Sequence, residues 1–141
     1  MKIMVVGGGG REHAIIKKIK ENPQVTELYA LPGNGGIAKD ATCVDIAAKD
    51  VEGVVAFAKE KGIDFAVVAP DDPLVLGMVD ALNAIGIPCF GPDKKAAILE
   101  GSKVFSKNLM KNTASPQRRM KCLMIWKRRW LISKPHLCRP L

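Results

Sequence analysis

Short apolar runs that alternate with helix-like segments are the feature that most restricts the fold of this chain. Most of the runs end at glycine or proline, which is typical of buried strands. Their alternation with helical patterns along residues 1–102 predicts an open parallel sheet flanked by helices, a Rossmann-like α/β fold with right-handed crossovers. We expect strands at Lys2–Val6, Glu27–Leu31, Thr42–Ile46, Phe65–Ala69 and Pro88–Phe90, and helices at Arg11–Lys20, Asp50–Lys61, Leu74–Ile85 and Lys94–Glu100.

Two of these helices carry specific positional signals. The first is expected to turn Ala14, Ile15 and Ile19 toward the sheet, with lysines on the opposite face. Asp50 has the side chain of a helix N-cap, and Gly62 stands where a glycine ends the second helix.

The formal net charge of +8 is confined to one end of the chain. Residues 1–102 hold 11 basic and all 14 acidic residues and therefore carry a charge of −3, whereas residues 103–141 hold 11 basic residues and no acidic one. From about residue 112 the hydrophobic period is also lost, and both tryptophans, Trp126 and Trp130, lie in this part. The sequence predicts a poorly ordered basic tail after the α/β domain.

Neither a membrane span nor a metal centre is expected. No apolar run approaches the roughly 18 residues that cross a bilayer, and the apolar start is too short for the core of a signal peptide. The cysteines are scattered without the close pairs that zinc sites use, at Cys43, Cys89, Cys122 and Cys138. These features predict a cytoplasmic protein with reduced thiols.

Four consecutive glycines, Gly7 to Gly10, follow the first strand and open the first helix. Glycines let a backbone approach a ligand closely, and the start of a helix offers free N–H groups to an anion. Arg11 can add a charge-assisted contact to a phosphate, and Glu12 suits the helix dipole and can hold a hydroxyl or an amine. A packing role for the glycines is the alternative, and we favour ligand binding.

A dinucleotide-binding fingerprint is the rival interpretation of this loop. It requires a third glycine at the position of Glu12, and it expects an acidic residue at the end of the second strand, where Leu31 and Pro32 stand. Both requirements fail, which argues against nicotinamide or flavin binding.

Two further loops are expected at the same edge of the sheet, because the carboxyl ends of parallel strands converge there. Asn34, within Pro32–Gly36, offers both a donor and an acceptor. Asp71 or Asp72 can accept hydrogen bonds from ribose hydroxyls or an amine. Asp72 can also cap the following helix, with Pro73 at its first position.

No catalytic residue is predicted from the histidines. Neither His13 nor His136 has a nucleophile or a second metal ligand at the sequence spacing of a known catalytic or metal-site motif. His13 is expected to be a packed, hydrogen-bonded residue of the first helix.

The segment from Gly8 to Ala14, Gly-Gly-Gly-Arg-Glu-His-Ala, closely resembles the amino-terminal signature of phosphoribosylamine–glycine ligases. The resemblance covers residues 1 to about 111 and continues through Pro32–Gly36, Asp71–Val75, Phe90–Pro92 and Ala96–Lys103. One departure is Asp71, because the family pattern usually carries the longer glutamate there.

The resemblance implies the amino-terminal domain of an ATP-grasp ligase, which couples glycine to 5-phosphoribosylamine while ATP is converted to ADP and phosphate. ATP and magnesium are implied for domains beyond the matched region, so this chain is expected to bind no cofactor and to be inactive alone. Its expected ligand is a phosphoribosylamine-type small molecule, with no specific nucleic acid. The implied substrate-binding residues are Gly8, Gly9, Gly10, Arg11, Glu12, Asn34, Asp71, Asp72 and Pro73.

Three segments follow from the resemblance and the change in composition: a substrate-binding domain at 1–102, the start of a linker to an ATP-grasp domain at 103–111, and an aberrant basic tail at 112–141. A shifted reading frame near codon 112, or a foreign end, is the economical explanation of the tail. The alternative is a genuine appendage. The chain would then be a non-catalytic nucleic-acid-binding protein that neutralises phosphates and stacks tryptophans on bases.

Overall fold

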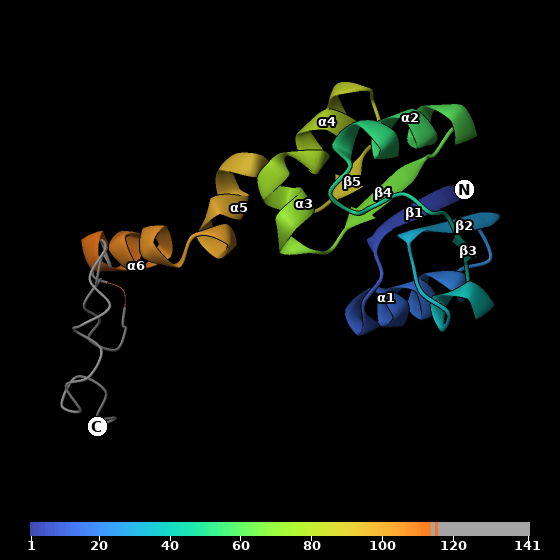
Figure 1. Cartoon of the computed structure of the whole chain (residues 1–141), viewed down its shortest axis with the longest axis horizontal. Helices are drawn as coiled ribbons and strands as arrows, with labels where there is room; N and C mark the ends of the chain where they lie inside the picture. Colours follow the sequence, from blue (N-terminus) through green and yellow to red (C-terminus); the bar gives the residue numbers. More distant parts are fainter. Residues whose placement is uncertain (114, 116–141) are drawn as a thin grey trace. The chain divides into compact units, whose positions relative to one another are not determined.

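A sheet of five parallel strands forms the centre of the compact unit Met1–Ser106, in the order β3-β2-β1-β4-β5 (Figure 1). The computed structural model describes residues 1–113 and 115, so the predictions about the basic tail and the nucleic-acid alternative fall almost entirely outside the described residues. The strands are β1 Lys2–Gly7, β2 Glu27–Pro32, β3 Thr42–Cys43, β4 Phe65–Val68 and β5 Cys89–Phe90. The predicted open parallel α/β fold is confirmed.

The helices are α1 Gly10–Lys20, η1 Ile37–Lys39, α2 Val51–Lys61, α3 Asp71–Leu76, α4 Met78–Ala84, α5 Lys94–Gly101 and α6 Lys103–Asn112. Helices cover both faces of the sheet, with α1 on one face and α2 and α4 on the other (Figure 1). Met4 and Val6 of β1 belong to the larger core, with side chains of α2, α3 and α4, whereas Val5 packs with Ile16 of α1. The central strands are apolar because both of their faces are buried.

The predicted caps of α2 are confirmed. A side-chain oxygen of Asp50 accepts a hydrogen bond from the backbone N–H of Gly53 at 2.9 Å. Gly62 ends the helix in the left-handed region, with φ 63°, which favours glycine.

The single helix predicted over Leu74–Ile85 is wrong. Gly77 adopts φ 92° and separates α3 from α4. Asp72 is also not the N-cap, because the helix begins one residue earlier, at Asp71, after Pro70. The carboxylate of Asp72 instead pairs with Lys49 at 2.6 Å.

Two smaller predictions also need correction. Ala14 of α1 is exposed, and the fully buried residue of that helix is Ile16, with Ile15 and Ile19 only half-buried beside it. The third strand ends at Cys43, because the backbone turns after it, with the N–H of Ile46 donating to the carbonyl of Val44 at 2.7 Å.

The residues that the sequence assigns to the start of a linker, 103–111, are helical in α6. Within the described residues of this helix no side chain is buried.

The strand order places a topological switch between β1 and β4. The chain passes from β1 to β2 and β3 on one side and then returns to the other side for β4 and β5. Loops that leave β1 and β4 therefore run in opposite directions at the carboxyl edge of the sheet, which is where open α/β sheets bind ligands.

Candidate functional site

The loops after β1, β2 and β4 meet at the carboxyl edge of the sheet, as predicted. The N–H of Gly33 donates to the carbonyl of Gly7 at 3.2 Å, which joins the first two loops. A Cβ atom on Gly7 would lie 2.9 Å from Cγ of Pro70, so the third loop packs closely against the first.

Two of the four glycines in the first loop are explained by the backbone and its packing. Gly7 has φ 125°, a conformation that favours glycine, and a Cβ on Gly8 would lie 2.5 Å from the carbonyl oxygen of Gly33. A Cβ on Gly9 would lie 2.5 Å from Oε2 of Glu12, so a side chain there would displace the end of the Glu12 side chain. Around Gly10, by contrast, there is open space, and packing gives no reason for the absence of a side chain.

Glu12 is the one buried charged side chain among the described residues, with 3% of its surface exposed. Its Oε2 accepts a hydrogen bond from the backbone N–H of Gly9 at 2.6 Å. This contact forms half of a capping box at the start of α1. Glu12 therefore fixes the shape of the glycine loop from inside.

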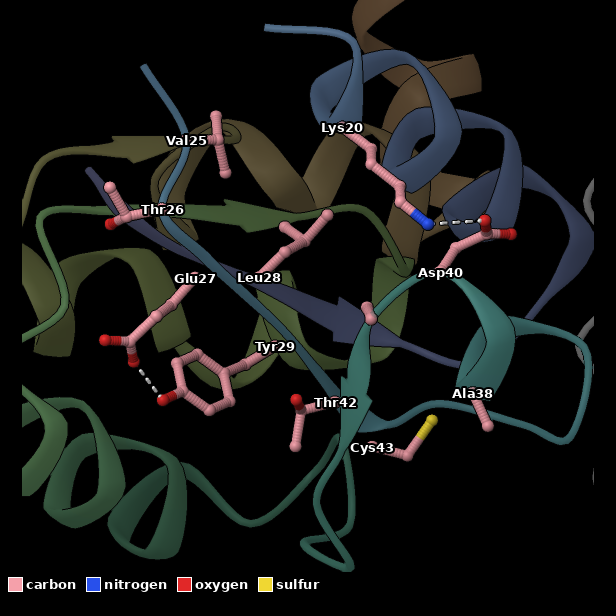
Figure 2. Close-up of a pocket in the computed structure, with 11 residues that line it drawn as sticks. Lys20, Val25, Thr26, Glu27, Leu28, Tyr29, Ala38, Asp40, Thr42 and Cys43 are labelled. Carbon is pink, nitrogen blue, oxygen red and sulfur yellow. Dashed lines mark hydrogen bonds and ion pairs between the residues drawn. The ribbon is translucent and has the colours of Figure 1, made fainter. Parts of the chain in front are cut away.

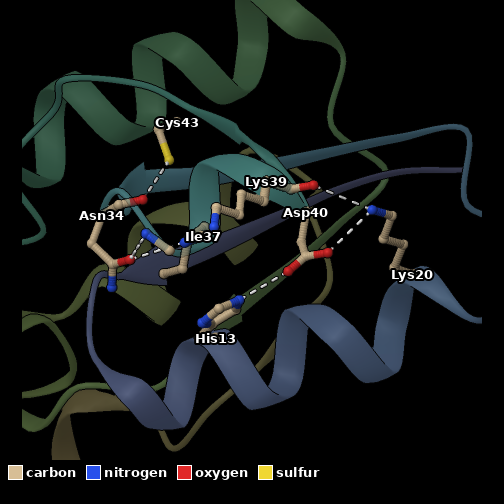
Figure 3. A network of polar contacts seen from close by, with 8 residues as sticks. His13, Lys20, Asn34, Ile37, Lys39, Asp40 and Cys43 are labelled. Carbon is tan, nitrogen blue, oxygen red and sulfur yellow. Dashed lines mark hydrogen bonds and ion pairs between the residues drawn. The ribbon is translucent and has the colours of Figure 1, made fainter.

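Asn34 holds the first two loops together through its side-chain amide. Figure 3 shows the contacts that its Oδ1 makes within the second loop. Nδ2 donates to the carbonyl of Gly8 at 2.6 Å, and Oδ1 accepts from the N–H groups of Gly36 and Ile37 at 2.7 and 2.9 Å. A side-chain amide has two N–H donors and an oxygen with two lone pairs. Asn34 thus keeps one N–H available to a ligand.

His13 connects α1 to the segment after η1 (Figure 3). Its Nε2 lies 2.9 Å from Oδ2 of Asp40, whose Oδ1 is 3.2 Å from Nζ of Lys20. The hydrogen bond to His13, with that to Lys20, lowers the pKa of Asp40 below its ordinary value. The structure places His13 as a packed, hydrogen-bonded residue, in agreement with the sequence.

Arg11 lines an open hollow of about 610 Å³ on the β4–β5 side of the switch point. The hollow is walled by the ends of β4 and β5, with Phe90 and Glu100 at its border. Among the described residues the guanidinium of Arg11 has no hydrogen bond or ion pair. Its guanidinium is available to an anion at the start of α1, where the first N–H groups lack intrahelical acceptors.

Asp71 and Asp72 border a second hollow, of about 280 Å³, rather than the one that Arg11 lines. Both carboxylates are exposed. Asp72 pairs with Lys49 and thereby raises the pKa of that lysine. Glu100 lines both hollows, so they adjoin each other. Pro73 is fully buried, and its ring supports the loop from within the core.

Sequence reasoning missed Phe90 and Glu100 as site residues. Phe90 is 66% exposed although it ends a strand. Its position at the carboxyl end of β5 was the available signal. Glu100 had no such signal, because only the packing of α5 against α3 brings it to the hollows.

A larger hollow, of about 720 Å³, lies beside the first half of β2 and the segment that leads into β3 (Figure 2). None of the predicted site residues lines it. Within it, Tyr29 donates a hydrogen bond to Glu27, and this bond with that from Lys2 lowers the pKa of Glu27. This hollow lies away from the switch point between β1 and β4.

Within residues 1–113 and 115, no group of three or more His, Cys, Asp or Glu side chains is arranged to hold a metal ion. Cys43 and Cys89 are free thiols, and burial raises the pKa of Cys89 to about 11. Cys122 and Cys138 lie outside the described residues. No helix in the described part is both long and apolar enough to cross a bilayer.

Comparison with known proteins assigns residues 1–100 to the family described as phosphoribosylglycinamide synthetase, N domain. A phosphoribosylamine–glycine ligase of Agrobacterium fabrum is 55% identical over 109 residues, which are 77% of this chain and 26% of that protein. The ligase of Caldanaerobacter subterraneus is 46% identical over 121 residues, 86% of this chain and 29% of that protein. The chain thus spans about a quarter of the length of these relatives.

Solved structures agree with this assignment. The phosphoribosylamine–glycine ligase of Thermotoga maritima matches with a TM-score of 0.59 and 32% identity, over 81% of this chain and 25% of that one. The biotin carboxylase domain of a thermophilic 2-oxoglutarate carboxylase matches with a TM-score of 0.59 at 20% identity, which shows a shared fold only.

Proposed function

We propose, from the premise that the chain belongs to the family of phosphoribosylglycinamide synthetase N domains, that it forms the sugar-phosphate side of a ligase site. The ligase would couple glycine to 5-phosphoribosylamine with conversion of ATP to ADP and phosphate, in purine biosynthesis. The names of the relatives and the resemblance over residues 1 to about 111 support this reaction.

The observation that carries the proposal is the guanidinium of Arg11, which has no partner among the described residues, beside an open hollow on the β4–β5 side of the switch point. A phosphate group at this place can accept charge-assisted hydrogen bonds from Arg11 and from the first N–H groups of α1. The remaining N–H of Asn34 and the carboxylate of Asp71, which lines the adjoining hollow, are polar groups that suit ribose hydroxyls. The shape of the proposed site is set by Gly8, Gly9, Glu12 and Pro73. Asp72 forms an ion pair with Lys49.

ATP and magnesium belong to the proposed reaction of the longer ligase. Because the matched segment is only 26% of the Agrobacterium fabrum ligase, we propose that ATP and magnesium bind the part of the ligase outside this match. The chain alone would then bind the phosphoribosyl group without catalysing ligation. We also propose a cytoplasmic location, because the relatives are ligases of a cytoplasmic pathway.

Calorimetric titration with ribose 5-phosphate, a stable compound that carries the same sugar and phosphate, tests this proposal. The full chain should bind it, and Arg11→Ala should weaken binding by about tenfold or more, since a charge-assisted hydrogen bond contributes roughly 1.5–3 kcal/mol. Lys59→Ala, which removes an exposed positive charge from α2, is the matched control and should change affinity by less than about twofold. Equal affinities of the Arg11 variant and the unchanged chain would refute the site.

A further inference from the structure

Two residues of opposite charge, Arg11 and Glu100, line the hollow of about 610 Å³ on the β4–β5 side of the switch point. Among the described residues no other charged side chain lines this hollow. Arg11 comes from the first turn of α1 and Glu100 from the last turn of α5. The two side chains do not pair with each other, and within the described part of the chain neither has another ion pair or a hydrogen bond. Both charges are therefore available to one ligand that carries an anion at one end and a hydrogen-bond donor at the other.

The packing of α5 determines where Glu100 lies. At the start of the helix, the N–H of Lys94 donates to Oδ2 of Asp80 in α4 at 2.8 Å. At its end, a Cβ on Gly101 would overlap a methyl group of Val75, so α5 lies directly against α3 (Figure 1). The helix is thereby fixed at both ends, and the exposed side chain of Glu100 lies at the border of the hollow.

The ligand proposed above has this arrangement of groups. 5-Phosphoribosylamine carries a phosphate at one end of the sugar and an amino group on the anomeric carbon at the other. A phosphate bound at Arg11 and the start of α1 leaves the anomeric substituent to the second charged residue of the hollow, Glu100. A carboxylate accepts hydrogen bonds from N–H and O–H groups and repels a second anion.

We propose that Glu100 determines specificity at the anomeric carbon. Its carboxylate accepts a hydrogen bond from the amino group of a phosphoribosylamine, and it disfavours sugar phosphates that carry an anionic group at that position. This role rests on the function proposed above, because it requires the phosphate to bind at Arg11.

Three sugar phosphates that differ only in this substituent test the role of Glu100 by calorimetric titration of the full chain. The carbocyclic analogue of 5-phosphoribosylamine has a stable, positively charged amine, ribose 5-phosphate has a hydroxyl, and ribose 1,5-bisphosphate has a phosphate. Glu100→Gln keeps the shape of the side chain and removes its charge. The variant should bind the amine about five- to tenfold more weakly, because a charge-assisted hydrogen bond is lost. It should bind ribose 5-phosphate within about threefold of the unchanged chain, and the bisphosphate at least about threefold more tightly, because a repulsion is removed.

The opposite signs of these changes separate a specificity role from a structural one, since a disturbed hollow would weaken the binding of all three compounds. Glu60→Gln is the matched control, because it removes the same charge from an exposed position of α2 that pairs only with Lys61 among the described residues. It should change each affinity by less than about twofold. All titrations use one ionic strength, because salt screens exposed charges.

The specificity role is overturned if Glu100→Gln changes the three affinities in the same direction, or if it binds them as Glu60→Gln does. Weaker binding by Arg11→Ala without an effect of Glu100→Gln would overturn only this role and leave the proposed function standing. The expected effects of Glu100→Gln together with unchanged binding by Arg11→Ala would refute the phosphate site but not the role of Glu100. Both proposals fail if none of the three compounds binds the chain.

Discussion

Replacement of Gly8 by alanine tests whether the glycine loop is held by packing. The new Cβ would lie 2.5 Å from the carbonyl oxygen of Gly33 and 3.2 Å from its carbonyl carbon. Both are backbone atoms, so the contact cannot be relieved by rotation of a side chain. The two loops must instead move apart by several tenths of an ångström.

The decrease in the free energy of unfolding can be estimated from the contacts that such a movement disturbs. Overpacking of this kind typically costs about 1–3 kcal/mol. The separation also strains the hydrogen bonds from Asn34 to Gly8 and from Gly33 to Gly7, which contribute roughly 0.5–1.5 kcal/mol each. We expect Gly8→Ala to lower the free energy of unfolding by about 2–4 kcal/mol, and the melting temperature by roughly 10–25 °C for a unit of this size.

Gly10→Ala is the matched control, because nothing lies within 4 Å of a Cβ at that position. It stands at the start of α1, where alanine should keep the stability or raise it by up to about 1 kcal/mol. Thermal and urea unfolding followed by circular dichroism measure both variants. Equal melting temperatures of Gly8→Ala and Gly10→Ala would refute the packing explanation of the loop.

Three further predictions concern single polar groups. Asn34→Ala should lower the free energy of unfolding by about 1–3 kcal/mol, since it leaves three backbone groups without their partner, and a melt that matches the unchanged chain would contradict this. The hydrogen bond to His13 lowers the pKa of Asp40 in the folded chain. The ionised Asp40 therefore stabilises the fold above the ordinary aspartate pKa of 3.8, and this stabilisation is lost as the pH falls from 3.8 through the lower pKa of the folded chain. Asp40→Asn should therefore flatten the acid limb of the stability–pH curve, and an unchanged limb would count against the contact. Cys89, with a pKa of about 11, should react with iodoacetamide at pH 8 far more slowly in the folded chain than in urea, as peptide mass spectrometry can show.

The sequence predicted the strands and the caps of α2 because these depend on neighbouring residues. Apolar runs buried on both faces identified β1 and β4, and Asp50 and Gly62 each act within one turn of their own helix. The break at Gly77 was missed because a glycine inside a helical pattern is often tolerated at a cost of only about 1 kcal/mol. Only the structure shows that this glycine adopts a left-handed conformation.

The sequence predicted that the loops meet at the carboxyl edge of the sheet, but not which contacts their residues make. Loops at the carboxyl edge follow from the parallel topology, and so does the meeting of Asn34 with the glycine loop. Glu12 was harder to interpret, because its capping partner is Gly9, which lacks the hydroxyl that usually marks a capping box. The pairing of Asp72 with Lys49 joins residues far apart in the chain, and no local pattern encodes it.

The contacts within the domain explain why its glycine-rich signature presents so few polar groups to a ligand. Neighbouring atoms occupy the space that a side chain would need at Gly8 and Gly9, and Glu12 accepts a hydrogen bond from the N–H of Gly9. Three of the four hydrogen-bonding positions of the Asn34 amide are used within the protein. Among the described residues, the polar groups that these contacts leave free for the proposed sugar phosphate are chiefly Arg11, the N–H groups at the start of its helix, and Asp71 in the adjoining hollow. Most of the polar groups in the signature therefore act within the domain, where they fix the shape of the glycine loop and join it to the loop after β2.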